Sequence, residues 1–437
     1  MSACQSHQRK NEPFRVLALL TGMNSIKSFC LPCLVLTSVA GAVSGQPFRT
    51  DINPALTYYQ AFNVAPDHSP TDRDYLFTNE WRDQKLPDRF GELLAGYDNE
   101  FRLIRQAAQS TAPCDWGIDF GAGPETLLGH LFRVKTAAQV ARLRVMWDLQ
   151  QNQQTNACED LLAALALGRN GSTDGSLISA LVQFAVERIV CTTVAENFNH
   201  FSPEMLSQIS DGLGGPPAQG TVADSIQAEK SFRYWFINRI TDLQTEYPGN
   251  DAKVMEGFHK RYDSAMANPD GKQETNNTWP QIVAASGGTS DGVIKVLHDM
   301  EPVYDRLANI ETLPRAQYEE QIKEFGADIT NSSNPFVHEL FPALLKCRPK
   351  EFAASADLAM VQAAIQYKLH GEAGLQSVAN PLGHGPFGFQ RFLFDGVDRG
   401  FELGADYAGV GYPEVFIFVE TDGPPFLVFG KRAGQAP

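Results

Sequence analysis

The sequence predicts a mainly α-helical protein that ends in a small antiparallel β-sheet. Three features carry this prediction. Apolar residues recur at helical spacing three times between residues 127 and 201. Prolines stand repeatedly where helices are expected to begin, and after Asn380 β-branched and aromatic residues alternate between glycines and prolines. Together these features favour an irregular bundle or short solenoid of helical hairpins with a C-terminal sheet.

The helices are expected to follow one another along most of the chain. Asn53 can cap the first helix and Pro54 fits its first position. Beyond the three central helices, we expect helices over residues 72–81, 87–110, 203–212, 221–245, 254–262, 293–310, 314–329, 335–347 and 349–369. A loop rich in glycine and aromatic residues separates two of them at residues 112–123, and three or four short strands are expected from residue 380.

Changes in composition suggest four parts. Residues 1–45 form an N-terminal extension and signal peptide, residues 46–217 a first helical domain, residues 218–379 a second helical domain, and residues 380–437 a small β-rich segment. The run Gly-Leu-Gly-Gly-Pro-Pro at residues 212–217 is the clearest candidate linker.

The N-terminal region resembles an export signal that starts at Met23. Lys27 precedes an apolar run over residues 29–43, and small residues follow it. Translation from Met23 or from Met1 remains open. We expect an exported, periplasmic or secreted protein. The alternative is a membrane anchor through residues 29–45, although its apolar run is shorter than the roughly 20 residues of a spanning helix.

Charge and cysteine content limit the classes of partner. Acidic residues outnumber basic ones by 51 to 36, which gives a formal net charge of −15, so nucleic acid is not an expected partner. Any contact with a membrane is expected only through an uncleaved N-terminal segment. Four cysteines follow the signal region, at positions 114, 158, 191 and 347. A disulfide between Cys158 and Cys191 and two separate buried thiols are equal alternatives.

Several motifs resemble a group of uncharacterised exported bacterial helical proteins. The motifs are a Cys-x-Trp-Gly-x-Asp loop (Cys114, Trp116, Gly117, Asp119), His130 at a helix start, a Leu-Ile-Ser helix (Leu177 to Ser179) and a Gly-Pro-Phe segment (Gly385 to Phe387). The resemblance implies a helical fold and export, and it implies no activity. Residues 138–168 are also similar to a tetratricopeptide unit that lacks its defining residues, and residues 381–403 resemble the C-terminal segment of type II secretion pseudopilins.

The loop at residues 115–119 holds the candidate catalytic residues. Asp115 and Asp119 flank Trp116, and two carboxylates beside an aromatic ring suit sugar cleavage or sugar binding. Glu125 and His130 follow and could assist acid–base chemistry. The structural alternative is a turn in which Trp116 fills the core, the aspartates cap helices and His130 is partly buried.

The remaining candidates are weaker. The aromatic run at residues 232–236 cannot face one core with all its rings, so Tyr234 and Trp235 are candidate binding residues, with a second helix layer as the alternative. His338 and Glu339 begin like a zinc-protease helix, but Pro342 stands where the second histidine is required, so no metal site is predicted. No cofactor motif is present.

Two functions therefore stay open. The first is a noncatalytic exported scaffold or binding protein of the cell envelope, with an envelope protein or glycan as partner. The second is a hydrolase that acts on an envelope polymer at the Asp115–Asp119 loop. A cleft that holds two of the four acid–base candidates within about 6 Å would favour the hydrolase. A buried Trp116 and capping aspartates would favour the binding protein.

Overall fold

The computed structural model describes residues 49–78, 81, 85–266, 278–383, 385–405, 415–422, 427–428 and 431–432. Arg49 to Pro437 form one compact unit. The predicted signal peptide, the alternative anchor and both candidate start positions lie outside the described residues. Within them, α7 (Leu177–Glu196) is long and apolar enough to cross a membrane, but 61% of its most apolar window is buried, as in a core helix of a soluble protein.

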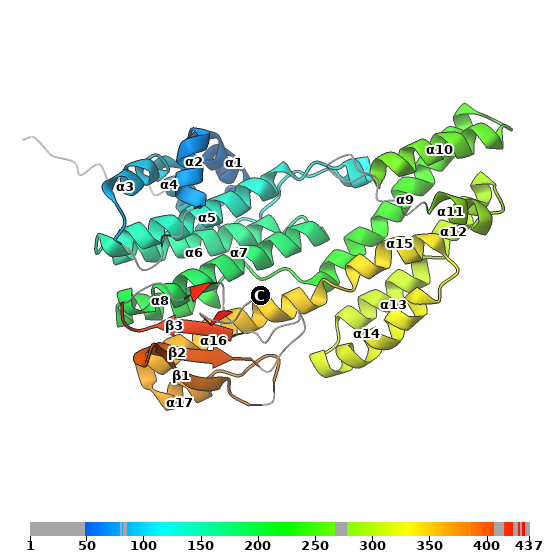
Figure 1. Cartoon of the computed structure of the whole chain (residues 1–437). Helices are drawn as coiled ribbons and strands as arrows, with labels where there is room; N and C mark the ends of the chain where they lie inside the picture. The colour runs from blue at the N-terminus through cyan, green and yellow to red at the C-terminus, as the bar shows by residue number, and fades with distance from the viewer. Residues whose placement is uncertain are drawn as a thin grey trace, which may run out of the picture. The chain divides into compact units, whose positions relative to one another are not determined.

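The described chain is mainly helical with a small C-terminal antiparallel sheet, which confirms the predicted fold class (Figure 1). The N-terminal helices are α1 (Pro54–Val64), α2 (Pro70–Phe77), α3 (Asp88–Ala95), α4 (Asp98–Ala108), the 3-10 helix η1 (Phe120–Glu125), α5 (Gly129–Gln150), α6 (Gln154–Gly171), α7, η2 (Phe198–His200) and α8 (Pro203–Leu213). The helices that follow are α9 (Val222–Glu246), α10 (Asp251–Ala265), α11 (Trp279–Ala285), α12 (Ser290–His298), α13 (Glu301–Glu311), α14 (Arg315–Thr330), α15 (Pro335–Leu344), α16 (Arg348–His370) and α17 (Glu372–Ser377).

Local capping explains where several helices begin. The Asn53 side chain accepts a hydrogen bond from the Ala55 amide at 3.0 Å, and Pro54 occupies the first position of α1. Ser202 caps α8 in the same way, through the Met205 amide at 3.3 Å. Both predicted starts are confirmed.

Two helices predicted as continuous are each divided in the structure. The helix expected over residues 87–110 is broken between α3 and α4, where the Tyr97 amide bonds back to Leu94 in a tight turn beside Gly96. The helix expected over residues 293–310 is broken between α12 and α13, where Pro302 stands in the first turn of the second helix. The apolar period continued through both turns, so it did not reveal them.

The three central helices were predicted correctly, and α5, α6 and α7 pack side by side (Figure 1). Small residues allow the close approach. Ala157 and Ala164 are fully buried on α6, and a Cβ atom at Gly168 would lie 2.6 Å from Val186 on α7. The contact between these three helices is therefore a closely packed part of the core.

The expected boundary at residue 217 does not coincide with a division between compact units. The α16 helix packs against both α7 and α8 across that point. The candidate linker is also held in place, because the buried Arg169 guanidinium donates to the carbonyls of Leu213, at 2.8 Å, and Gly215, at 2.7 Å. Glu187, which is fully buried, pairs with the same guanidinium at 3.2 Å. The stretch at residues 212–217 is therefore a loop that Arg169 holds in place.

The C-terminal sheet has the antiparallel order β1–β2–β3, formed by β1 (Gly388–Phe394), β2 (Val397–Gly404) and β3 (Val415–Val419). A bulge lies between Phe392 and Leu393. The sheet packs on α7 and α16 (Figure 1). The ring of Phe401 on β2 meets the ring of Phe198 with a distance of 5.8 Å between the ring centroids. A two-stranded hairpin of β4 (Leu427–Val428) and β5 (Lys431–Arg432) follows.

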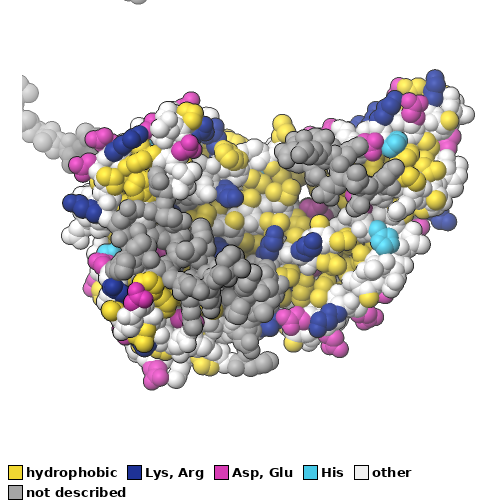
Figure 2. Space-filling model, viewed as in Figure 1, with side chains coloured by type: hydrophobic (Ala, Val, Ile, Leu, Met, Phe, Trp, Pro, Cys, Tyr) yellow, Lys and Arg dark blue, Asp and Glu magenta, His cyan; other side chains and the backbone are white. Residues whose placement is uncertain are grey.

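The described cysteines form no disulfide. Cys114, Cys158, Cys191 and Cys347 are free thiols, and all except the half-buried Cys114 are buried. The alternative of separate thiols at Cys158 and Cys191 therefore holds in this structure. Among the described side chains on the face in Figure 2, Lys and Arg lie singly or in small groups between Asp and Glu. These described side chains form no continuous basic surface for a phosphate backbone.

One buried carboxyl group has no partner within the described chain. Glu311, at the end of α13, is fully buried, and neither of its carboxyl oxygens has a hydrogen-bond partner there. Burial raises its pKa to about 8, while the Arg348 guanidinium partly opposes this shift. Glu311 is therefore protonated at neutral pH and costs stability when it ionises.

Replacing this carboxyl group should change how stability depends on pH. Between an unfolded pKa near 4.5 and the folded pKa of about 8, the folded wild-type protein holds a proton that the unfolded chain releases. Its free energy of unfolding should fall as pH rises through this window, and Glu311→Gln should remove on the order of 1 to 3 kcal/mol of that fall. Urea unfolding at pH 5 and pH 8 measures the difference. The exposed Glu324→Gln variant is the control, and an identical pH dependence in both variants would disprove the assignment.

Candidate functional site

Trp116 lies inside the protein and holds the loop at residues 112–123, the acidic loop, to the core. Only 4% of its surface is exposed, and its indole N–H donates to the Asn170 carbonyl at 2.6 Å. Its ring stacks on Tyr58 and Phe62 of α1 at centroid distances of 5.7 and 6.3 Å, and on His130 at 4.6 Å. A ring enclosed on these sides is unavailable for stacking on a bound sugar.

Both candidate aspartates bind their own backbone. The Asp115 carboxylate accepts the Gly117 amide at 2.8 Å, and the Asp119 carboxylate accepts the Gly121 amide at 2.7 Å as the N-cap of η1. Gly117 has a φ of 66°, a left-handed conformation that favours glycine. Asp119 therefore caps a helix, as the structural alternative expected, whereas Asp115 holds a turn of the loop without capping a helix.

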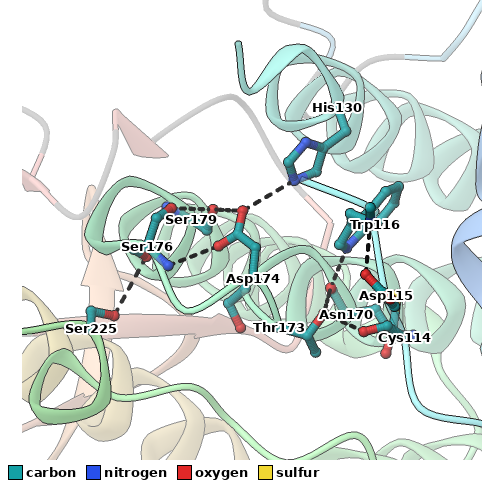
Figure 3. Close-up of polar contacts among 12 residues, drawn as sticks. Cys114, Asp115, Trp116, His130, Asn170, Thr173, Asp174, Ser176, Ser179 and Ser225 are labelled. Carbon is teal, nitrogen blue, oxygen red and sulfur yellow. Dashed lines mark hydrogen bonds and ion pairs between the residues drawn. The ribbon is translucent and has the colours of Figure 1, made fainter. Parts of the chain in front are cut away.

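His130 is buried beside Asp174 (Figure 3). Glu125, in contrast, is exposed at the end of η1. The His130 Nε2 atom lies 3.6 Å from an Asp174 carboxylate oxygen, which is longer than a hydrogen bond. Burial lowers the pKa of His130, and the Asp174 charge opposes this effect. The imidazole is therefore neutral at pH 7, and no described contact joins it to either loop aspartate.

Asp174 organises the start of α7 (Figure 3). One of its oxygens accepts the Ser176 amide at 2.8 Å, and the other accepts the Ser179 hydroxyl at 2.7 Å. In a nucleophilic triad the histidine stands between the serine and the acid. Here the acid contacts both other groups, and Ser179 is fully buried. The arrangement is a helix cap rather than a nucleophile site.

A pocket of about 460 Å³ lies between η1 and α9 and contains both candidate binding residues of the aromatic run. Its lining includes Phe120, Gly121, Tyr234, Trp235, Asn238 and Asp242. The Tyr234 side chain is 46% exposed, whereas Trp235 is 8% exposed. The volume falls within the range of small-molecule sites.

The contact between Gly123 and Trp235 brings the acidic loop to this pocket. A Cβ atom at Gly123 would lie 2.3 Å from the Trp235 ring, and the glycine has a φ of 61°. Phe120 also meets the Phe232 ring edge-on at 6.5 Å. The rings of the aromatic run thus divide between the core, a second layer at η1 and the pocket, which agrees with the inference that they cannot face one core.

Of the polar residues of the pocket, only Tyr234 was among the sequence-based candidates, and Ser231, Asn238 and Asp242 were missed. Ser231, Tyr234, Asn238 and Asp242 follow one another at intervals of three and four, so they share one face of α9. That spacing is visible in the sequence, but a polar helix face usually means solvent exposure. Asp174 and Asn170 were missed because their partners, His130 and Trp116, are distant in sequence.

Comparison with known proteins found no relative of this chain. No family model, no curated protein and no solved structure matches this chain. Among the residues that the structure describes, no group of three or more His, Cys, Asp or Glu side chains is placed to hold a metal ion.

Removing the buried indole tests the structural role of the loop. Trp116→Ala should lower the free energy of unfolding by about 3 to 5 kcal/mol, because it deletes a packed ring and leaves a cavity. Phe132→Ala removes an aromatic ring that is 71% exposed, and it should change stability by less than about 0.5 kcal/mol. Urea unfolding of both variants makes the comparison. Similar small losses would contradict the role of Trp116 in the core.

Proposed function

We propose that this protein is a noncatalytic, exported binding protein of the cell envelope, and that its ligand binds in the pocket between η1 and α9. The main support for this proposal is the contrast between the carboxylates of the acidic loop and the side chains that line the pocket. The loop carboxylates are bound by backbone amides, whereas the pocket presents an exposed aromatic ring beside polar side chains. Export is inferred from the signal-like sequence that begins at Met23.

The geometry supports binding more than hydrolysis. A glycosidase needs two carboxyl groups that face the scissile bond, one to donate and one to accept. Asp115 and Asp119 each hold a separate turn, and the ring between them is buried. The pocket itself contains one carboxylate, Asp242, which accepts from Arg239 at 3.2 Å. This composition suits recognition better than acid–base catalysis.

The test measures retention and cleavage together. The protein is purified from the cells that express its full sequence and is mixed with washed envelopes. The envelopes are then sedimented. The bound fraction and the soluble glycan or peptide fragments are then measured. We expect retention without fragment release, and at least a tenfold loss of affinity in a Tyr234→Ala/Asn238→Ala double variant, because both pocket contacts are removed.

Conservative variants of the loop separate the two functions. Asp115→Asn and Asp119→Asn retain an oxygen that can accept the backbone amide but remove the carboxylate. The binding protein predicts unchanged retention in both. Fragment release that disappears in these variants would support the hydrolase instead. Retention that is equal in the wild type and the pocket double variant would overturn the pocket as the binding site.

A further inference from the structure

Three glutamate side chains, one each from α9, α13 and α16, lie around one buried thiol. Cys347, directly before α16, interacts electrostatically with both Glu229 and Glu311. Glu311 interacts in turn with Glu351. Glu311 is fully buried, Glu351 is buried, and Glu229 is half-buried. The acidic groups of three helices therefore converge at one place, and we call these three glutamates the carboxyl cluster.

Glu311 and Glu351 share one cation, Arg348. Its guanidinium donates to one Glu351 oxygen at 2.6 Å, while its charge also acts on Glu311. The other Glu351 oxygen accepts the amide of Val222, the first residue of α9, at 2.7 Å. Glu311 itself has no hydrogen-bond partner within the described chain. An ionised Glu311 would therefore compete for a cation that Glu351 already binds.

Glu229 accepts a backbone amide but forms no ion pair in the described part of the chain. It accepts the amide of Leu177, the first residue of α7, at 3.3 Å. The neighbouring cations on α9, Lys230 and Arg233, pair instead with Glu301 of α13, at 3.4 and 3.3 Å. The charge of an ionised Glu229 would therefore be opposed by burial without the gain of a salt bridge.

The other titratable groups around the cluster do not supply the missing positive charge. Burial raises the pKa of Tyr304 on α13 and of Cys347 far above 7, so both are uncharged at neutral pH. Asp224 acts on Glu351, and Lys350 acts on Cys347, but both side chains are exposed and of opposite sign. Water screens such exposed charges.

The cluster therefore holds protons that free carboxyl groups would release. Burial raises the pKa of Glu229 to about 7 and that of Glu311 to about 8, from an ordinary value of 4.5. It also raises the pKa of Glu351. If α9 and α13 moved away from α16, water would reach these groups and their pKa values would return toward 4.5. Loss of the protons thus favours separation as pH rises.

We propose that the carboxyl cluster makes the junction of α9 and α13 with α16 a pH-dependent joint, which is closed in mildly acidic solution and opens transiently above neutral pH. Between pH 4.5 and the raised pKa of each group, the closed joint holds a proton that the open joint releases, so each group makes opening up to about tenfold easier per pH unit. Opening also frees the first amides of α7 and α9. The joint needs no ligand, so it goes beyond the proposed binding function and is tested separately from it.

Labelling of the Cys347 thiol measures the opening. The thiol is 5% exposed, so it reacts with N-ethylmaleimide mainly when the joint is open. The full chain is labelled between pH 5.5 and 8, and mass spectrometry of the Cys347 peptide gives the rate. Each rate is divided by that of the same peptide in the urea-unfolded chain at the same pH, which removes the effect of thiolate formation.

We expect this ratio for Cys347 to rise at least about tenfold between pH 5.5 and 8. Cys158, which is 2% exposed on α6, serves as the internal reference for opening of the whole protein. Its ratio should rise less than threefold. If Cys347 follows Cys158 at every pH, or if neither ratio rises, the joint is overturned.

A double variant assigns the effect to the cluster. Glu229→Gln/Glu311→Gln keeps the shape of both side chains and removes their ionisation, so the Cys347 ratio should change less than threefold over the same pH range. Glu320→Gln/Glu324→Gln, on the exposed face of α14, is the matched control and should keep the wild-type rise. Circular dichroism shows whether each variant has folded.

A wild-type rise that persists in the folded Glu229→Gln/Glu311→Gln variant would overturn the assignment to these carboxyl groups. A rise that is confined to Cys347 and lost in this variant supports the joint. If the double variant does not fold, the comparison of Cys347 with Cys158 in the wild type decides.

Discussion

The hydrogen bond from the Trp116 indole to the Asn170 carbonyl fixes the N-terminal half of the protein. It joins the loop at residues 112–123 to the end of α6, and the same ring packs on α1 and on His130 of α5. Four segments distant in sequence therefore meet at one side chain. Because a buried indole N–H needs a partner, the position of the ring is set by polarity as well as by packing. The glycine-rich loop can remain irregular because this one residue anchors it.

A second buried polar contact has the same effect further along the chain. Arg169 lies one residue before Asn170, and its guanidinium holds the carbonyls of residues 213–217 while pairing with Glu187. The end of α6 is thus the point at which both the acidic loop and the Gly-Pro turn are attached. Burying an arginine is favourable only when its donors are satisfied, and backbone carbonyls at a turn supply the acceptors. This explains why a stretch with the composition of a linker is an ordered part of one compact unit.

Sequence reasoning succeeded where a local pattern decides the structure. The apolar period of α5 to α7, the caps at Asn53 and Ser202 and the strands after residue 380 were all visible in short windows. It failed at the breaks beside Gly96 and Pro302, where a tight turn preserves the apolar phase of the helices. The candidate site was harder, because the role of Asp115 depends on a backbone amide two residues away and that of Trp116 on a carbonyl 54 residues away. Residue types alone do not distinguish a capping carboxylate from a catalytic one.

The acidic loop and the aromatic run were treated as separate candidates, yet the structure connects them. By accepting the Gly121 amide, Asp119 starts η1, and η1 carries Phe120 and Gly121 to the pocket wall. Gly123 then allows the loop to lie directly on the Trp235 ring, because any side chain there would collide with it. The Asp119 carboxylate therefore shapes the wall of the pocket from outside it, through the backbone. A pair of aspartates that resembles a catalytic site in the sequence thus arises from the hydrogen bonds that two turns require.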